Sequence, residues 1–215
     1  MRKGGNSSAN RVDPEEYVDP KKPRSGTSVN CSTAASGLAD AFVKLTLAQL
    51  QDPSASGRQK YWSLWFGNRV AWCACFVSWN IANTEYNGQK LSDVIDLTMS
   101  GKPGDSCVYN FMNWAYKSSN PAVSFKYNDN CSRYAGKNGS GTYTPKQGDL
   151  IFFDWAASWS GTMPTCFDCG PDHIGIVQKT EGGTIYTIEG NSSDSVRERT
   201  YALNSCQVIG FASWY

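Results

Sequence analysis

The sequence predicts an α+β fold in which N-terminal helices pack on a C-terminal antiparallel sheet of about five strands. Two observations indicate it. From about Ser32 to residue 117, apolar side chains recur mostly at helical spacing, whereas after Pro145 the apolar period changes to two. A chain of 215 residues, 40% of them apolar, is also long enough to bury a substantial core.

Residues 1–30 are expected to form a disordered tail or linker, and residues 31–215 a single domain. The first segment is rich in Gly, Ser, Asn, Pro and charge, and Pro14, Pro20 and Pro23 prevent a continuous helix. It carries too few apolar residues to offset the entropy lost on ordering. Such a segment suits a tether to a larger assembly.

The helical half is predicted element by element. Leu38, Ala41, Phe42 and Leu45 indicate a first helix, with Ser32 or Thr33 as its cap. An aromatic-rich loop with one short helix follows in QDPSASGRQKYWSLWFGNRV. Three further helices are expected in AWCACFVSWNIAN, starting near Ala71 or Trp72, in LSDVIDLTMSGK and in SCVYNFMNWAYKSS.

The strand-like half follows a polar stretch, residues 118–147, that is expected to be a loop. Five runs alternate between apolar and polar residues, namely GDLIFFDW, DHIGIVQKT, GTIYTIEG, SVRERTYAL and QVIGFASWY. The dipeptide Gly182-Gly183 predicts a tight hairpin between the second and third of these runs.

Composition excludes several classes of function. The formal charge is +1, which argues against a general nucleic-acid binder. The longest apolar stretch, Val70 to Val77, is far shorter than the roughly 20 residues of a membrane span, so no membrane insertion is expected. The first ten residues contain no apolar segment of a signal peptide, so export is expected by another route.

Cys73 and Cys75 are candidates for nucleophilic chemistry. They lie near the predicted start of a helix, where exposed N–H groups and the helix dipole favour a thiolate. Two residues apart on a helix, they point about 200° away from each other, so only one can face a cleft. The alternative is that both are small buried hydrophobic residues.

His173, the single histidine, opens one strand-like run, and Glu189 ends the next. The turn at Gly182-Gly183 brings both to the same end of one hairpin, where a carboxylate can orient an imidazole. Asn191 is a second candidate for that orienting role. The alternatives are an ordinary hydrogen-bonded histidine and a solvated acid at a strand end.

Four segments, AWCACFVSW, QGDLIFFDW, DHIGIV and IEGN, together resemble the CHAP family of cysteine, histidine-dependent amidohydrolases and peptidases. That family is related to the NlpC-like cell-wall hydrolases, and the resemblance covers roughly residues 61–215. It implies a papain-like α+β domain that cleaves an amide bond of peptidoglycan. The bond would be that between muramic acid and L-Ala, as in an N-acetylmuramoyl-L-alanine amidase, or one in the stem or cross-bridge peptide, as in an endopeptidase.

Carried over by position, the resemblance makes Cys73 the nucleophile and His173 the base. Glu189 becomes the orienting acid with Asn191 beside it, and Cys75 becomes a core residue. The implied mechanism is acyl transfer through a cysteine acyl-enzyme, without a cofactor. The implied setting is extracellular action on the cell wall, as by a phage endolysin, a tail-associated lysin, or a hydrolase of a mobile element or secretion apparatus.

Alternative interpretations remain open at this point. Cys166 and Cys169 have the spacing of a structural zinc site or a disulfide, and Cys131, Cys206 or His173 could complete the zinc ligands. In the hydrolase, Tyr61, Trp72 and Trp155 are expected to bind the substrate. A non-catalytic module of the same fold would bind cell-wall peptide or another protein, and aromatic residues such as Tyr61 and Trp155 would suit its groove. An amidase of a small-molecule conjugate would use the same three catalytic residues.

Overall fold

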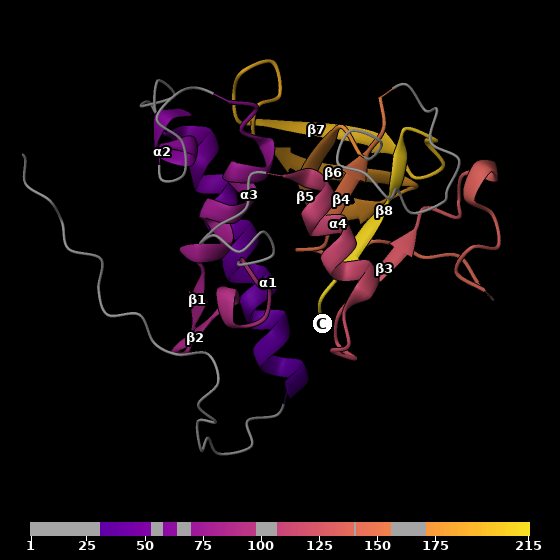
Figure 1. Cartoon of the computed structure of the whole chain (residues 1–215), viewed down its shortest axis with the longest axis horizontal. Helices are drawn as coiled ribbons and strands as arrows, with labels where there is room; N and C mark the ends of the chain where they lie inside the picture. The colour runs from indigo at the N-terminus through magenta and orange to yellow at the C-terminus, as the bar shows by residue number, and fades with distance from the viewer. Residues whose placement is uncertain (1–30, 53–57, 64–69, 98–106, 140, 156–170) are drawn as a thin grey trace, which may run out of the picture.

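The protein is described here by a computed structural model that covers residues 31–52, 58–63, 70–97, 107–139, 141–155 and 171–215. Helices come first and a large antiparallel sheet follows, which confirms the α+β prediction (Figure 1). The predicted tail, residues 1–30, lies outside the described residues.

The helices of the described residues are α1 (Cys31–Ala48), α2 (Arg58–Trp62), α3 (Cys73–Ala82) and α4 (Val108–Lys117), with 3-10 turns at Gln49–Gln51, Leu91–Asp93 and Ser132–Tyr134. Each α-helix falls in a segment where one was predicted. The helix predicted in LSDVIDLTMSGK is wrong as far as the structure describes that segment, because a single 3-10 turn, Leu91–Asp93, forms there. A small hairpin of β1 (Glu85–Tyr86) and β2 (Gln89–Lys90), joined by an Asn-Gly turn, ends just before it.

The main sheet of the described residues has six strands in the order β3-β8-β4-β5-β6-β7, all antiparallel. The strands are β3 (Ser124–Tyr127), β4 (Leu150–Phe153), β5 (His173–Glu181), β6 (Thr184–Glu189), β7 (Arg197–Ala202) and β8 (Val208–Ser213). The last five match the five predicted runs. The sixth, β3, lies in the stretch predicted as a loop, and its pairing with the C-terminal strand β8 is a long-range contact that local pattern does not show.

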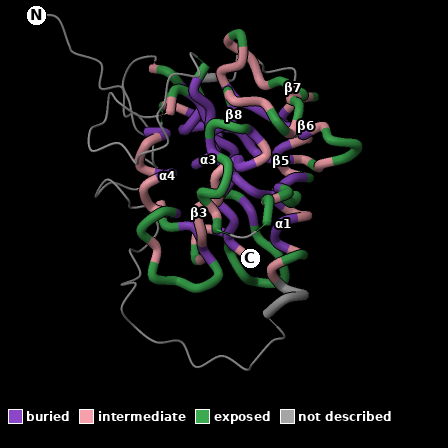
Figure 2. The backbone as a smooth tube through the Cα atoms, turned by 90° about the vertical axis from the view of Figure 1, so that its right-hand side faces the viewer, coloured by how far each residue is buried: buried purple, intermediate pink, exposed green. Residues whose placement is uncertain are grey.

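Both faces of the sheet are covered. Helices α1 and α3 pack on β5 and α4 packs on β3 and β8, so the main core lies between the helices and the sheet (Figures 1 and 2). The other face carries a smaller cluster of buried residues: Ile151, Phe153, Val177, Ile185, Val208 and Phe211. The middle strands are therefore buried on both sides. None of the described helices is long and apolar enough to cross a membrane.

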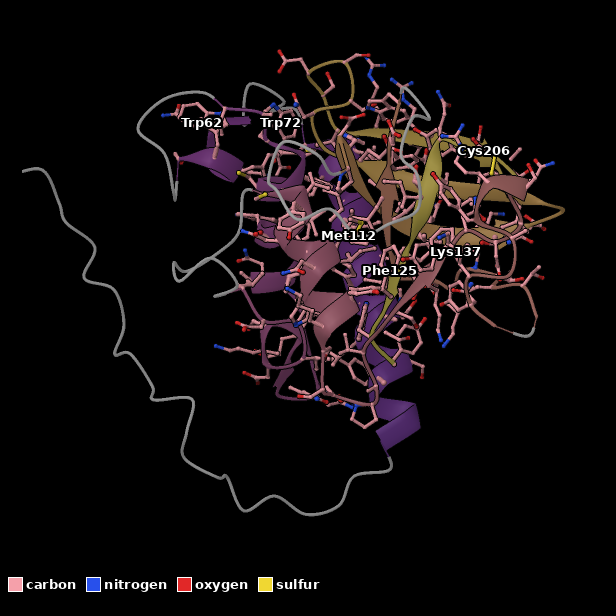
Figure 3. The ribbon with its side chains drawn as sticks, turned by 45° about the vertical axis from the view of Figure 1, so that its right-hand side comes forward. Trp62, Trp72, Met112, Phe125, Lys137 and Cys206 are labelled. Atoms are coloured by element: carbon pink, nitrogen blue, oxygen red, sulfur yellow. A yellow bond between two sulfur atoms is a disulfide. The ribbon has the colours of Figure 1, made fainter. Side chains whose placement is uncertain are left out.

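A disulfide joins Cys131, beside the 3-10 turn Ser132–Tyr134, to Cys206 in the turn between β7 and β8 (Figure 3). Because both sulfurs are bonded to each other, neither can serve as the extra zinc ligand that the sequence left open. Cys166 and Cys169 lie outside the described residues. In Figure 3 the disulfide at Cys206 and the residue Trp72 lie on opposite sides of the molecule.

Candidate active site

Cys73 is the first residue of α3, and its side chain is almost fully buried, with 4% exposed. The helix begins there because Trp72 leaves helical geometry at φ −109°, ψ 17°, while its carbonyl accepts the first helical hydrogen bond from Phe76 N at 2.9 Å. The N–H groups of this first turn have no acceptor within the helix. They and the helix dipole surround the Cys73 sulfur with positive potential, which suits negative charge that develops there during a reaction.

His173 is the first residue of β5 and is 6% exposed. Its Nε2 lies 3.0 Å from Oε2 of Glu189. Hydrogen bonding and charge from the Cys73 side chain also act on its ring and help to raise its pKa. The structure therefore brings thiol, imidazole and carboxylate together, with the imidazole acted on by both of the others.

Glu189 ends β6 and is 1% exposed. It reaches His173 because Gly175, two residues after His173 on β5, has no side chain. A Cβ at Gly175 would lie 2.8 Å from Cγ of Glu189, closer than two such carbons normally approach. The glycine thus leaves the space in which the carboxylate crosses between the strands.

A β-bulge in β5 places the Glu189 carboxylate on the same face of the sheet as the His173 side chain. From the Gly182-Gly183 turn, Glu181 pairs with Thr184, and a regular hairpin would continue until Glu189 paired with Ile176. The side chain of Ile176 belongs to the main core under the helices. The register instead shifts between Val177 and Lys179, so that Ile176 pairs with Ile188. One further step puts Glu189 opposite Gly175, on the face that His173 shares by alternation.

The electrostatics of the site favour a charged imidazole. Burial alone lowers the pKa of His173, but the hydrogen bonds and charges of Cys73 and Glu189 outweigh it and raise the pKa to about 9. An imidazole that holds its proton at neutral pH beside a cysteine is placed to protonate a leaving group after the sulfur has attacked a carbonyl carbon.

The remaining residues proposed for the site from the sequence lie in different places. Asn191 follows β6 in the left-handed conformation, φ 59°, and the described partner of His173 Nε2 is Glu189. Trp155 is 42% exposed, and its ring centroid lies 5.4 Å from that of His173. Tyr61 and Trp72 are buried and stacked on each other at 5.4 Å, so they belong to the core rather than to an open groove.

Trp72 supports the site through a hydrogen bond that links two of its segments. Its indole Nε1 donates to Asp194 Oδ1 at 3.3 Å, in the loop that follows Glu189. Three residues of this loop, Asn191, Ser193 and Asp194, have positive φ angles of 59°, 52° and 58°. The hydrogen bond ties the start of the Cys73 helix to the strand that ends in Glu189.

Two residues of the site were not anticipated from the sequence. Thr187 Oγ1 donates to Glu189 Oε1 at 2.6 Å, and Glu189 acts by charge and hydrogen bonding on the phenol of Tyr201 on β7, whose pKa is raised. The position of Thr187 beside Glu189 could have been predicted locally, since residues two apart on a strand share a face. The position of Tyr201 could not, because only the pairing of β6 with β7 brings it near Glu189.

The described residues around His173 provide no set of metal ligands. No group of three or more His, Cys, Asp or Glu side chains suited to a metal ion occurs in the part of the chain that the structure describes. His173, the one histidine, is engaged by Cys73 and Glu189.

Comparison with solved structures finds distant similarities. The chain aligns with "The crystal structure of Ly7917" at 15% identity and a TM-score of 0.41, over 81% of this chain and 62% of that one. "The crystal structure of Ly7917 with the hydrolyzing product of MDP" gives 14% identity and a TM-score of 0.42. "X-ray Crystal Structure of PlyC" gives 17% identity and a TM-score of 0.36, over 88% of this chain and 42% of that one. With TM-scores below 0.5, these similarities support no conclusion about the function of this chain.

The chain thus spans about 62% of the length of Ly7917. The comparison with curated proteins gives no match. The comparison with protein families does: residues 65–191 match the CHAP domain, which is more than half of the chain. This stretch runs from before Cys73 to beyond Glu189, so it includes Cys73, His173 and Glu189, and the fold is the papain-like α+β arrangement that the resemblance implied. The protein belongs to the CHAP domain family.

Proposed function

We propose that the protein is a peptidoglycan hydrolase that cleaves an amide bond through a cysteine acyl-enzyme. The observation that carries the proposal is the buried cluster of Cys73, His173 and Glu189, in which His173 hydrogen-bonds Glu189 and its pKa is raised by both neighbours, in a CHAP domain. A thiol, an imidazole and a carboxylate in this order form the constellation of a cysteine hydrolase.

In the first half of the reaction, the Cys73 thiolate attacks the amide carbonyl and a C–S bond forms. His173 gives its proton to the departing amine as the C–N bond breaks, which leaves a thioester. In the second half, neutral His173 takes a proton from water, and the hydroxide attacks the thioester. The products are a free carboxylate and the regenerated thiol. The N–H groups at the start of α3 are suited to stabilise the oxyanion of both steps.

Two features support a wall polymer as the substrate. Trp155 presents an exposed ring that stacks on Phe153 at 4.8 Å and borders His173, which suits contact with the apolar face of a sugar or with a peptide. The disulfide Cys131–Cys206 is typical of proteins that work outside the reducing cytosol, in keeping with action on the cell wall.

The test is a mass-spectrometric digest of purified peptidoglycan by the wild type, Cys73→Ala and Cys75→Ala. Cys75 is the matched control, because it is a buried thiol two residues further along the same helix. We expect the wild type and Cys75→Ala to release the same fragments and Cys73→Ala to release none. The fragment masses then distinguish an N-acetylmuramoyl-L-alanine amidase from a stem or cross-bridge endopeptidase.

The same assay includes Trp155→Ala, which should raise KM more than it lowers kcat if the ring binds substrate. Release of fragments by Cys73→Ala would remove Cys73 as the nucleophile. If the wild type releases nothing from walls of several cross-bridge types, peptidoglycan hydrolysis is wrong. A sedimentation assay with the same walls would then test the non-catalytic binding module.

A further inference from the structure

The carboxylate of Glu189 has more partners than His173 alone. Thr187 Oγ1 donates to Oε1 at 2.6 Å, while His173 Nε2 lies 3.0 Å from Oε2. Tyr201, on the neighbouring strand β7, also acts on this side chain, because charge and hydrogen bonding with Glu189 help to raise the pKa of its phenol. These contacts come from three adjacent strands, and the carboxylate is 1% exposed, so water is not available to replace a lost donor.

We propose that Thr187 and Tyr201 are positioning residues, whose hydroxyls fix the Glu189 carboxylate in the orientation that holds and charges His173. This inference rests on the proposed function for its catalytic consequence, whereas its structural content concerns the Glu189–His173 contact itself.

Packing holds the stem of Glu189, since its Cγ lies closely against Gly175 on the β5 side. That contact acts on Cγ and not on the two carboxylate oxygens. We infer that the orientation of the oxygens is determined by the hydrogen-bond donors around them. A hydroxyl that occupies Oε1 directs Oε2 toward the imidazole.

Thr187 is well suited to this role. Its side chain is fully buried, and its β-branched form restricts rotation about χ1. The hydroxyl has a competing acceptor, the carbonyl of Arg199 at 3.4 Å, but the carboxylate at 2.6 Å is much closer and charged. Tyr201 is held in turn by its ring, whose centroid lies 4.7 Å from that of Phe153. Burial raises the pKa of Tyr201 above its usual value, so its hydroxyl remains a donor across the physiological range.

The consequence is measurable at His173. Among the described residues, the groups that shift its pKa are Cys73 from α3 and Glu189 from β6. On this proposal, Thr187 and Tyr201 act on the pKa of His173 only through Glu189. If the carboxylate turns away, its contribution to the raised pKa of His173 is lost. The imidazolium then deprotonates at lower pH, and the alkaline limb of activity moves down with it.

The experiment measures the pKa of His173 directly by NMR titration of its ring. The chain has one histidine, so a protein purified without a histidine tag gives a single imidazole signal. The variants are Thr187→Val and Tyr201→Phe, which remove a hydroxyl and little volume, and Thr187→Ser, which restores it. Matched controls are Thr180→Val, whose hydroxyl bonds the Pro145 carbonyl, and Tyr186→Phe, whose ring lies under Lys179.

We expect Thr187→Val and Tyr201→Phe each to lower the pKa of His173 by about one unit. Thr187→Ser and both controls should titrate like the wild type. The alkaline limb of kcat/KM should shift in parallel, with kcat falling more than KM changes. An unchanged titration in both Thr187→Val and Tyr201→Phe would overturn the proposal.

Two further outcomes distinguish a positioning role from a purely structural one and from a failure of the proposed function. Suppose that Thr187→Val has a melting temperature far below that of the wild type, and that the pKa of His173 in Thr187→Ser also stays below the wild-type value. Thr187 then has a structural role and the proposal fails for it. If the wild type cleaves no wall, the proposed function fails, yet the NMR titration still decides whether the two hydroxyls position Glu189.

Discussion

The β5–β6 hairpin carries a cation–carboxylate pair at each end, and the two pairs behave differently. Near the turn, Lys179 Nζ lies 2.5 Å from Glu181 Oε2, with 52% and 66% of the side chains exposed. At the other end, His173 Nε2 lies 3.0 Å from Glu189 Oε2, with 8% and 1% exposed. The longer contact is the one placed at the candidate active site.

The difference teaches that surroundings, rather than distance, decide what an ion pair does. Water and salt screen the exposed pair, and holding two long side chains together costs entropy, so it contributes little. The buried pair cannot exchange its partner for water, and removing one member leaves the other group buried and uncompensated. Its cation is also the one whose pKa lies near the physiological range.

The largest effect should come from neutralising each carboxylate without changing its shape. Glu189→Gln removes the charge that stabilises the His173 imidazolium, and kcat/KM should fall at least about 100-fold. Glu181→Gln changes the exposed pair in the same way and should leave kcat/KM within about twofold of the wild type. Steady-state rates on solubilised wall fragments measure both. Equal losses in the two variants would show that burial is not what distinguishes the pairs.

The next effect is on stability as a function of pH. Because the pKa of His173 is raised from 6.5 to about 9 in the folded protein, protonation there favours the folded state. This stabilisation is complete below pH 6.5 and is lost as the pH rises through 9. Thermal melts should therefore show Tm falling by roughly 5 °C over that interval, and less in Glu189→Gln. In Glu181→Gln the fall should match the wild type, and a flat wild-type profile would contradict the raised pKa.

Much of this hairpin could be predicted from its sequence. The alternation in DHIGIVQKT and GTIYTIEG indicated both strands, and Gly182-Gly183 indicated the turn, with φ angles of 57° and 77°. That His173 and Glu189 lie at the same end of the hairpin follows from the length of the two strands. Helix α3 could be predicted equally well, because its apolar residues and the position of Cys73 near its start are local features of the sequence.

Other features depend on contacts that no local pattern records. β3 forms against β8, some 85 residues further along the chain, and Cys131 meets Cys206 across a separation of 75. Tyr61 and Trp72 resembled groove residues because aromatic side chains suit both a core and a binding surface, and only burial distinguishes the two. Counting residues from the turn also showed no sign of the register shift, without which Glu189 would face the helices.

The smallest effect is expected from deleting Gln178, the residue at that register shift. Val177 already pairs with Thr187 and Lys179 with Tyr186, so removing the residue between Val177 and Lys179 lets the strands close without moving any pair. His173 and Glu189 should stay on one face, and kcat/KM should remain within roughly tenfold of the wild type. The measurement is activity together with the NMR titration of His173. If the deletion instead abolishes activity and lowers the pKa of His173 as Glu189→Gln does, then the local twist of the bulge, and not only its register, brings the imidazole and the carboxylate together.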